Sequence, residues 1–479
     1  MSEATTDRVK TNVAGLDGVL CGGLVPGRSY LVTGGPGTGK TTLGLHFLSA
    51  SPAPETLLIS LGEAERHLRR DAASIGLDLD GIPVLDLSPS GAQDDTPSYT
   101  LLEPWEAEAP DIRARIEAMF PDAPPARVFI DALSQLFHLV PDAYQFRKQV
   151  MTLLEYLTRA GSTVIYTAEQ GSGADDALQY LGDGIVHLER RDSTRTLRVL
   201  KFRGSGFAEG EHTVKLGARG MRVFEQLVPD AHTREAAGDA LPSGIEALDR
   251  LVGGGIERGT VTIISGPTGV GKTSLGMRFL WQAAHRGERA RIFTFEESEA
   301  TLRQRCEATG MPLAALGEQG LLGIEAVEPL RYAPAEFAWR VRQEVEQHDA
   351  RIVMIDSLAG FRQSISGDDL SVHAHALCRY LGNMGVTVLL INEQATIAGG
   401  ELRVSDHGIS YLADTILLLR YLEVDSELRK AIGVLKKRTS DFEKTLREFD
   451  ITPEGLSIGP PLQGLQGILS GVPTAHSRT

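Results

Sequence analysis

The segment Gly34-Gly35-Pro36-Gly37-Thr38-Gly39-Lys40-Thr41 decides the fold of the first half of this 479-residue chain. It fits the pattern GxxxxGK[ST] and follows the apolar run 30–33, so it predicts a strand that turns through a glycine-rich loop into a helix. Glycines allow the backbone to wrap closely around phosphate groups, and the helix N-terminus adds a partial positive charge. The segment therefore predicts a nucleotide-binding P-loop.

A second copy of this pattern lies in the other half of the chain, at Gly266-Pro267-Thr268-Gly269-Val270-Gly271-Lys272-Thr273. Lys272 and Lys40 are 272 − 40 = 232 residues apart. Asp356 and Asp131, which each end an apolar run after the P-loop, are 356 − 131 = 225 residues apart. Two landmarks with nearly the same offset indicate a duplicated plan.

Short β-branched runs alternate with helical stretches in each half, which is typical of a parallel sheet with right-handed crossovers. We predict an α/β fold of two tandem RecA-like P-loop NTPase domains with mostly parallel central sheets. A polar, alanine-rich stretch separates the halves and predicts a linker at 229–240, between a first domain at 1–228 and a second at 241–479.

The P-loops define the expected cofactors, ATP and Mg²⁺, because their backbone and lysines suit phosphate and their threonine hydroxyls suit the metal. The predicted nucleotide contacts are Gly35, Gly37, Thr38, Gly39, Lys40, Thr41 and Thr42 in the first half, and Thr268, Gly269, Val270, Gly271, Lys272, Thr273 and Ser274 in the second. The predicted metal ligands are Thr41 and Asp131, and Thr273, Asp356 and Glu296.

Carboxylates at the end of the next strand are candidates for the base that hydrolysis requires. The second half has two, Glu296 and Glu297. The first half has only Glu63, because Gly62 stands opposite Glu296 when the two strands are aligned. An ordinary surface glutamate is the alternative interpretation of Glu63, and slow hydrolysis in the first domain is expected.

Three further segments resemble the KaiC family of circadian-clock ATPases over nearly the whole chain: the run 295–298, the run 405–419, and Lys436-Lys437-Arg438 with its first-half counterpart Lys201-Phe202-Arg203. The resemblance implies a double-ring homo-hexamer in which Lys201, Arg203, Lys436 and Arg438 reach the nucleotide of a neighbouring subunit. From the residues alone, each K-x-R pair puts two cations on one face of a strand, and a solvated basic strand edge remains the alternative.

The resemblance also implies serine autokinase activity in the second domain. Ser410 matches the family's acceptor serine and Ser405 a nearby family threonine, whereas Tyr411 stands where the family has its acceptor threonine. We therefore expect autophosphorylation on Ser410 with Glu296 as base. The chain ends at Thr479, before the tail that KaiA captures in the clock protein, so regulation by KaiA is not expected, whereas another signalling partner is.

Composition limits the alternatives. The net charge of −15 disfavours nucleic acid as a partner. The three cysteines are far apart and do not form a disulfide framework, and no long apolar run indicates a membrane span, so a cytoplasmic protein is expected. Two alternative functions remain at this stage: a RecA- or helicase-type DNA-dependent ATPase, and a nucleotide-gated scaffold without significant chemistry.

Overall fold

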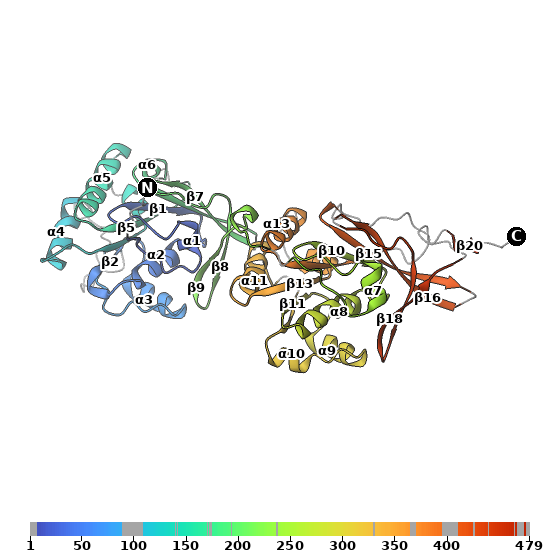
Figure 1. The fold of residues 1–479 in the computed structure, drawn as a ribbon. Helices are drawn as coiled ribbons and strands as arrows, with labels where there is room; N and C mark the ends of the chain where they lie inside the picture. The colour runs from blue at the N-terminus through green and yellow to red at the C-terminus, as the bar shows by residue number, and fades with distance from the viewer. Residues whose placement is uncertain are drawn as a thin grey trace. The chain divides into compact units, whose positions relative to one another are not determined.

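The computed structural model describes residues 7–88, 109–138, 140, 142–169, 171, 175–192, 194–235, 238–328, 331–364, 370–394, 411–424, 427–438, 440–463, 465–466 and 474–475. The chain divides into two compact units, 1–226 and 227–479, each built around a nine-stranded sheet (Figure 1). Among the residues described, no helix combines the length and the apolarity that crossing a membrane requires.

The sheet of the first unit has the order β3-β2-β4-β5-β1-β6-β7-β8-β9. The first six strands in this order are parallel, and β6 to β9 continue as antiparallel neighbours. The strands are β1 (Ser29–Gly34), β2 (Thr56–Ser60), β3 (Val84–Asp86), β4 (Arg127–Asp131), β5 (Thr163–Glu169), β6 (Gly184–Arg191), β7 (Thr194–Phe202), β8 (His212–Gly217) and β9 (Gly220–Phe224). The helices are α1 (Leu16–Val19), α2 (Lys40–Ser49), α3 (Glu65–Ser74), α4 (Ala109–Met119), α5 (Ala143–Arg159) and α6 (Asp175–Gln179), with 3₁₀ turns at Ala53–Glu55 and Leu133–His138.

The second unit repeats this plan with the order β12-β11-β13-β14-β10-β15-β16-β17-β18, again six parallel strands followed by antiparallel ones. The strands are β10 (Val261–Gly266), β11 (Arg289–Thr294), β12 (Leu322–Ala326), β13 (Ala350–Asp356), β14 (Thr387–Glu393), β15 (Thr415–Val424), β16 (Glu427–Lys437), β17 (Arg447–Thr452) and β18 (Gly455–Pro461), and β19 (Leu465–Gln466) pairs with β20 (Thr474–Ala475). The helices are α7 (Glu246–Leu251), α8 (Lys272–His285), α9 (Glu299–Ala308), α10 (Ala314–Glu318), α11 (Pro334–Glu346), α12 (Leu358–Ser364) and α13 (Leu370–Asn383).

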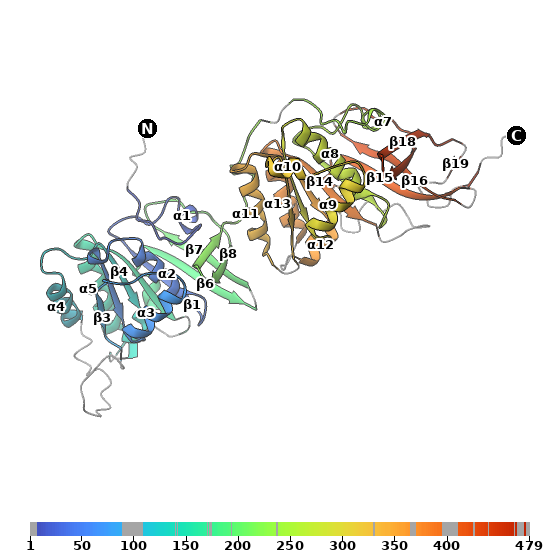
Figure 2. The ribbon, with the colours of Figure 1, turned by 90° about the horizontal axis from the view of Figure 1, so that it is seen from below.

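Helices cover both faces of the parallel part of each sheet, as Figures 1 and 2 show. In the first unit α2 and α3 pack on one face and α4 and α5 on the other. Phe129 and Ile130 are neighbours in β4, yet they belong to opposite apolar clusters because successive side chains of a strand point to opposite faces. Met354 and Ile355 of β13 likewise belong to the apolar clusters on opposite faces of the second sheet. These findings confirm the predicted α/β fold with mostly parallel central sheets.

An aspartate lies at the same distance before each P-loop lysine, at Asp17 and Asp249, and it has a structural role. Asp17 accepts hydrogen bonds from the backbone N–H and the hydroxyl of Thr11, at 2.9 and 2.8 Å. Asp249 accepts the same two bonds from Ser243, at 2.6 and 2.7 Å. These two aspartates therefore fix the chain where it enters each unit.

Residues 229–234, which the sequence assigns to a linker, lie against α13 within the second unit. The 3₁₀ turn Pro229–Ala231 begins this segment. Asn383 donates from its side-chain amide to the carbonyl of Pro229 at 3.0 Å, and its own carbonyl accepts from the N–H of Arg234 at 2.8 Å. Arg379 pairs with Asp230 at 3.0 Å. The segment is thus fastened to one helix by backbone and side-chain bonds.

Candidate nucleotide and catalytic site

Each P-loop connects the central strand of its sheet, β1 or β10, to a helix, as the sequence predicts. Gly39 and Gly271 are the residues before α2 and α8, with φ of 105° and 110°. A Cβ atom at Gly271 would lie 2.4 Å from Cδ1 of Ile451, and one at Gly39 would lie 2.7 Å from Cε of Met221. The positive φ angles therefore favour glycine at both positions, and a Cβ atom would also displace these side-chain ends.

The P-loop lysines lie inside their own loops. Lys40 donates to the carbonyls of Gly34 and Gly35 at 2.8 and 2.9 Å, and Lys272 donates to the carbonyl of Pro267 at 2.8 Å. Burial lowers the pKa of both ammonium groups, and nearby carboxylates oppose this effect. Each cation thus lies where the sequence predicts the phosphates to bind.

A hydroxyl and a carboxylate meet beside each loop. Thr41 donates to Asp131 at 2.6 Å, and Thr273 donates to Asp356 at 2.7 Å. Burial raises the pKa of Asp131, and it raises the pKa of Asp356 to about 6. Within the described residues, no group of three or more His, Cys, Asp or Glu side chains could hold a metal. One carboxylate and one hydroxyl per site fit Mg²⁺, which is typically bound through one or two carboxylates together with substrate phosphates.

The two adjacent glutamates of the second unit have different partners. Glu296 accepts a hydrogen bond from the hydroxyl of Ser357, the residue that follows Asp356. Glu297 forms an ion pair with Arg305 of α9 at 2.6 Å. Only the Glu296 carboxylate is therefore held directly beside the end of β13.

The first unit lacks the corresponding carboxylate. The N–H of Leu61 donates to the carbonyl of Asp131, as the N–H of Phe295 does to that of Asp356, each at 2.7 Å. Gly62 consequently occupies the place of Glu296, and Ala132 that of Ser357. Glu63 is exposed, and its carbonyl accepts a hydrogen bond from the hydroxyl of Ser60 at 2.5 Å.

Sequence analysis did not identify a further pair of glutamates at the phosphate end of the sheets. Glu169 ends β5 in register with Gly34, and Glu393 ends β14 in register with Gly266. These carboxylates exert the largest charge effects on the pKa of Lys40 and Lys272. The signal in the sequence was a repeated Glu-Gln pair at 169–170 and 393–394, with an offset of 393 − 169 = 224 residues that nearly equals that of the strand-end aspartates.

The predicted K-x-R cations lie at the opposite end of each sheet from the P-loop. Lys201 donates to the carbonyl of Gly182 at 2.7 Å and Arg203 pairs with Asp183 at 3.8 Å, just before β6 begins. In the second unit, Lys436 donates to the carbonyl of Ala413 at 2.6 Å, and Arg438 pairs with Asp414 at 3.6 Å. The adjacent P-loop strands have six residues, or roughly 20 Å at about 3.3 Å per residue, so these cations are not gathered at the P-loop of their own copy.

The predicted acceptor Ser410 and the nearby Ser405 lie outside the described residues. Tyr411 is described: its side chain is exposed, and its hydroxyl lies 3.5 Å from Nδ1 of His375. Both residues line a cavity of about 410 Å³ together with Arg379 and Arg438. The guanidinium of Arg438 donates to the carbonyl of Tyr411 at 3.1 Å, so this cation lies at the end of the predicted acceptor segment.

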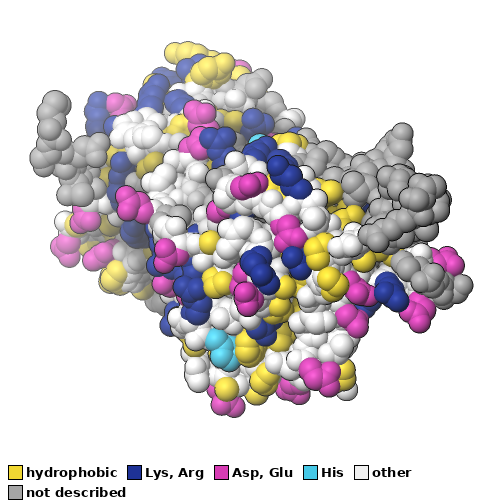
Figure 3. Space-filling view, turned by 45° about the vertical axis from the view of Figure 1, so that its right-hand side comes forward, with side chains coloured by type: hydrophobic (Ala, Val, Ile, Leu, Met, Phe, Trp, Pro, Cys, Tyr) yellow, Lys and Arg dark blue, Asp and Glu magenta, His cyan; other side chains and the backbone are white. Residues whose placement is uncertain are grey.

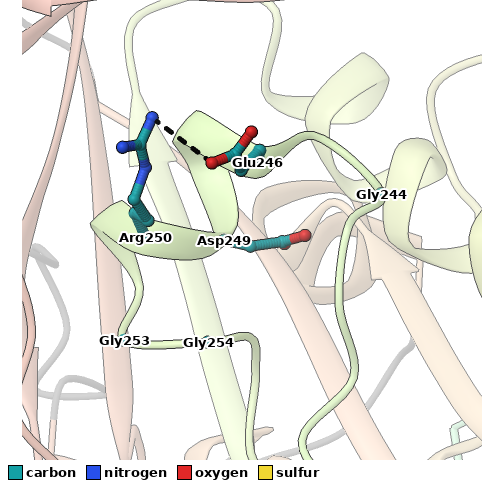
Figure 4. Close-up of a pocket in the computed structure, with 6 residues that line it drawn as sticks. All are labelled: Gly244, Glu246, Asp249, Arg250, Gly253 and Gly254. Atoms are coloured by element: carbon teal, nitrogen blue, oxygen red, sulfur yellow. Dashed lines mark ion pairs between the residues drawn. The ribbon is translucent and has the colours of Figure 1, made fainter.

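Another hollow, of about 570 Å³, lies beside α7 (Figure 4). Glu246 pairs with Arg250 at 3.9 Å, and Asp249 is engaged by Ser243. Both carboxylates that line the hollow therefore have partners. On the face drawn in Figure 3, basic and acidic side chains alternate among the described residues, and no continuous basic track for a phosphate backbone crosses that view.

Comparison with known proteins identifies relatives along nearly the entire chain. The family model for the KaiC ATPase matches residues 9–228 and 241–463. The circadian clock oscillator protein KaiC of Prochlorococcus marinus is 30% identical, over 97% of this chain and 95% of the relative. The proteins of the same name from Acaryochloris marina and Thermosynechococcus vestitus are 28% and 29% identical, over 98% and 99% of this chain and 92% and 93% of theirs.

Proposed function

This chain belongs to the KaiC family of ATPases, and from that premise we propose that it binds ATP with Mg²⁺ at both P-loops and hydrolyses it. We further propose that it forms a homo-hexamer, and that its second domain phosphorylates Ser410. The expected biological role is a signalling or clock-related switch, because the relatives are circadian clock oscillator proteins.

The observation that carries this proposal is the second site. There the P-loop lysine, the Thr273–Asp356 pair and the Ser357–Glu296 pair lie at the ends of β10, β13 and β11, which are parallel strands that end at the same edge of the sheet. Thr273 and Asp356 would hold Mg²⁺, which neutralises charge on the phosphates when it is bound. Lys272 would leave the carbonyl of Pro267 and donate to the phosphates instead.

Glu296 is the proposed base of the second domain. The hydroxyl of Ser357 fixes its carboxylate beside Asp356, where it can orient a water molecule or the hydroxyl of Ser410 and accept a proton. Glu297 is less suited because Arg305 neutralises it. In the first domain Glu63 is the remaining candidate, and the glycine in the place of Glu296 supports nucleotide binding with slow hydrolysis there.

The position of the K-x-R cations supports the proposed assembly. Lys201, Arg203, Lys436 and Arg438 lie at the end of each sheet far from its own P-loop, whereas they match family positions that reach a neighbour's nucleotide. A head-to-tail contact of this kind builds a ring when its rotation closes. We propose that these cations stabilise phosphate charge on the adjacent subunit.

Intact mass spectrometry with peptide mapping, after incubation of the full chain with Mg-ATP, tests the proposal. We expect ADP to be released and one phosphate to map to Ser410. The phosphate should be absent from Ser410→Ala and from Lys272→Ala. Phosphate that persists on Ser410 in Lys272→Ala would refute the autokinase. ADP release without phosphate would leave a ring ATPase, and the absence of both would favour a scaffold that only binds nucleotide.

A further inference from the structure

The third residue of the P-loop differs between the two copies, and this difference changes what lies beside the phosphate site. In the second copy it is Thr268, whose hydroxyl donates to a carboxylate oxygen of Glu393. In the first copy it is Pro36, which has no side-chain donor. The first unit also has a glutamate at the matching strand end, Glu169. The third P-loop residue can therefore donate a side-chain hydrogen bond to the strand-end glutamate only in the second copy.

The backbone around Glu393 is held firmly. The N–H of Gln394 donates to the carbonyl of Gly266 at 3.1 Å, which continues the strand pairing beyond the end of β14. The side-chain amides of Asn392 and Gln394 both donate to the hydroxyl of Ser265, each at 3.1 Å. With its neighbours fixed and its carboxylate bound to Thr268, Glu393 directs its charge towards the loop.

The strand order places this charge on the path of the terminal phosphate. β14 lies between β10, which leads into the P-loop, and β13, which ends at Asp356. A nucleotide held by the loop, with its metal at Asp356, must extend its phosphates past the end of β14. A carboxylate there repels each added phosphate charge, and a triphosphate brings more charge to this point than a diphosphate.

We propose that Glu393, oriented by Thr268, is a specificity-determining residue of the second site that weakens the binding of ATP relative to ADP. The inference rests on the proposed nucleotide binding at this site and adds a bias towards the product state. The bias is opposed only when cations, such as the metal or those of an adjacent subunit, surround the terminal phosphate.

Site-resolved nucleotide competition tests this inference. The full chain is photolabelled with 8-azido-ATP in Mg²⁺, the label on second-unit peptides is quantified, and labelling is competed with ADP or with AMPPNP, a non-hydrolysable ATP analogue. Glu393→Gln keeps an acceptor for Thr268 and removes the charge. We expect it to shift the competition ratio in favour of AMPPNP by roughly three- to tenfold. Thr268→Val, which frees the carboxylate to turn away, should shift the ratio less but in the same direction.

The matched control is Glu318→Gln, which removes one charge from the exposed end of α10. It should leave the ratio unchanged. If Glu393→Gln weakened the binding of ADP and AMPPNP equally, the contact between Thr268 and Glu393 would only support the loop. That result, or any other unchanged competition ratio, would overturn the inference. A wild-type second unit that takes up no label at all would instead refute the proposed nucleotide site itself, so the two failures are distinct.

Discussion

Adjacent residues of the same type have different environments in the second site. Glu296 is bound by the hydroxyl of Ser357, whereas Glu297 is paired with Arg305. Sequence position made both glutamates catalytic candidates, and only the family resemblance favoured Glu296 as the base for autophosphorylation. These partners support the proposal that Glu296 is the base, and they give Glu297 a structural ion pair.

Substitution of each glutamate separates these roles. Glu296→Gln should reduce the ADP release of the second domain by about 100-fold or more, because a positioned base contributes that much or more. Glu297→Gln should keep most of the turnover but lower the thermal stability of the protein, because Arg305 loses its partner. Steady-state ADP release measures both variants, with Lys272→Ala defining the level without the second site. If Glu297→Gln released ADP more slowly than Glu296→Gln, Glu297 would be the base instead.

Asp356 makes the stability of the nucleotide-free protein depend on pH. Its pKa in the folded state is raised by burial to about 6, above its ordinary value of 3.8. The folded chain therefore holds this proton more tightly than the unfolded chain, and the resulting stabilisation is complete below about pH 4 and lost as pH rises through about 6. Asp356→Asn has no such loss, because an amide stays neutral while it still accepts from Thr273.

We expect Asp356→Asn to be more stable than the wild type at pH 7.5, by up to about 3 kcal/mol, and to lose this advantage at pH 4. Thermal unfolding in EDTA without nucleotide measures the difference, with exposed Glu318→Gln as the control. An advantage of equal size at both pH values would show that the burial of the charge is not its cause. The same variant should fail to bind Mg-ATP at the second site.

At the scale of elements, each P-loop helix lies unusually close to its sheet. Gly44 of α2 and Gly276 of α8 are the fourth residues after the P-loop lysines. A Cβ atom at Gly44 would lie 2.1 Å from the ring of Phe129, and one at Gly276 would lie 2.6 Å from Sδ of Met354. The glycines set the depth at which the helices, and with them the loops, approach the sheets.

Gly44→Ala should therefore destabilise the first unit by about 1–3 kcal/mol, through overpacking against Phe129. The direction of the stability change is informative, because a glycine-to-alanine change in a helix with free space beside it stabilises that helix by roughly 0.5–1 kcal/mol. Calorimetry of the full chain measures the shift, and Gly206→Ala, where no neighbour lies within 4 Å, is the control. An increase in stability for Gly44→Ala would contradict the close contact between α2 and β4.

The elements that sequence predicted well are those whose requirements are local. The P-loop glycines and the strand-end aspartates recur in both halves because backbone conformation and alternation along a strand leave a pattern in a few consecutive residues. The contacts of Ser357 with Glu296 and of Thr268 with Glu393 join residues 61 and 125 positions apart. They depend on the order of strands in the sheet, which no local pattern specifies, so sequence supplied Glu296 without its partner and omitted Glu393.

At the scale of the whole molecule, the proposed ring predicts complementation between inactive variants. Lys272→Ala lacks the second P-loop lysine, and Arg438→Ala lacks the cation proposed to act on a neighbour. Each alone should show no second-domain turnover. In a fully exchanged equal mixture, about one quarter of the interfaces combine an intact loop with an intact arginine. We expect about one quarter of the wild-type second-domain ADP release, and no recovery would refute action across subunits.

The attachment of residues 229–234 to α13 decides how the two halves can be studied separately. A second-half fragment that begins at 241 would remove the partners of Asn383 and Arg379, and would uncover the ring of Tyr380, against which His232 packs at 5.2 Å. A fragment that begins at 227, where the compact unit begins, keeps residues 229–234 and their contacts with α13. Expression boundaries placed by homology at 241 would thus cut through the packed part of the molecule.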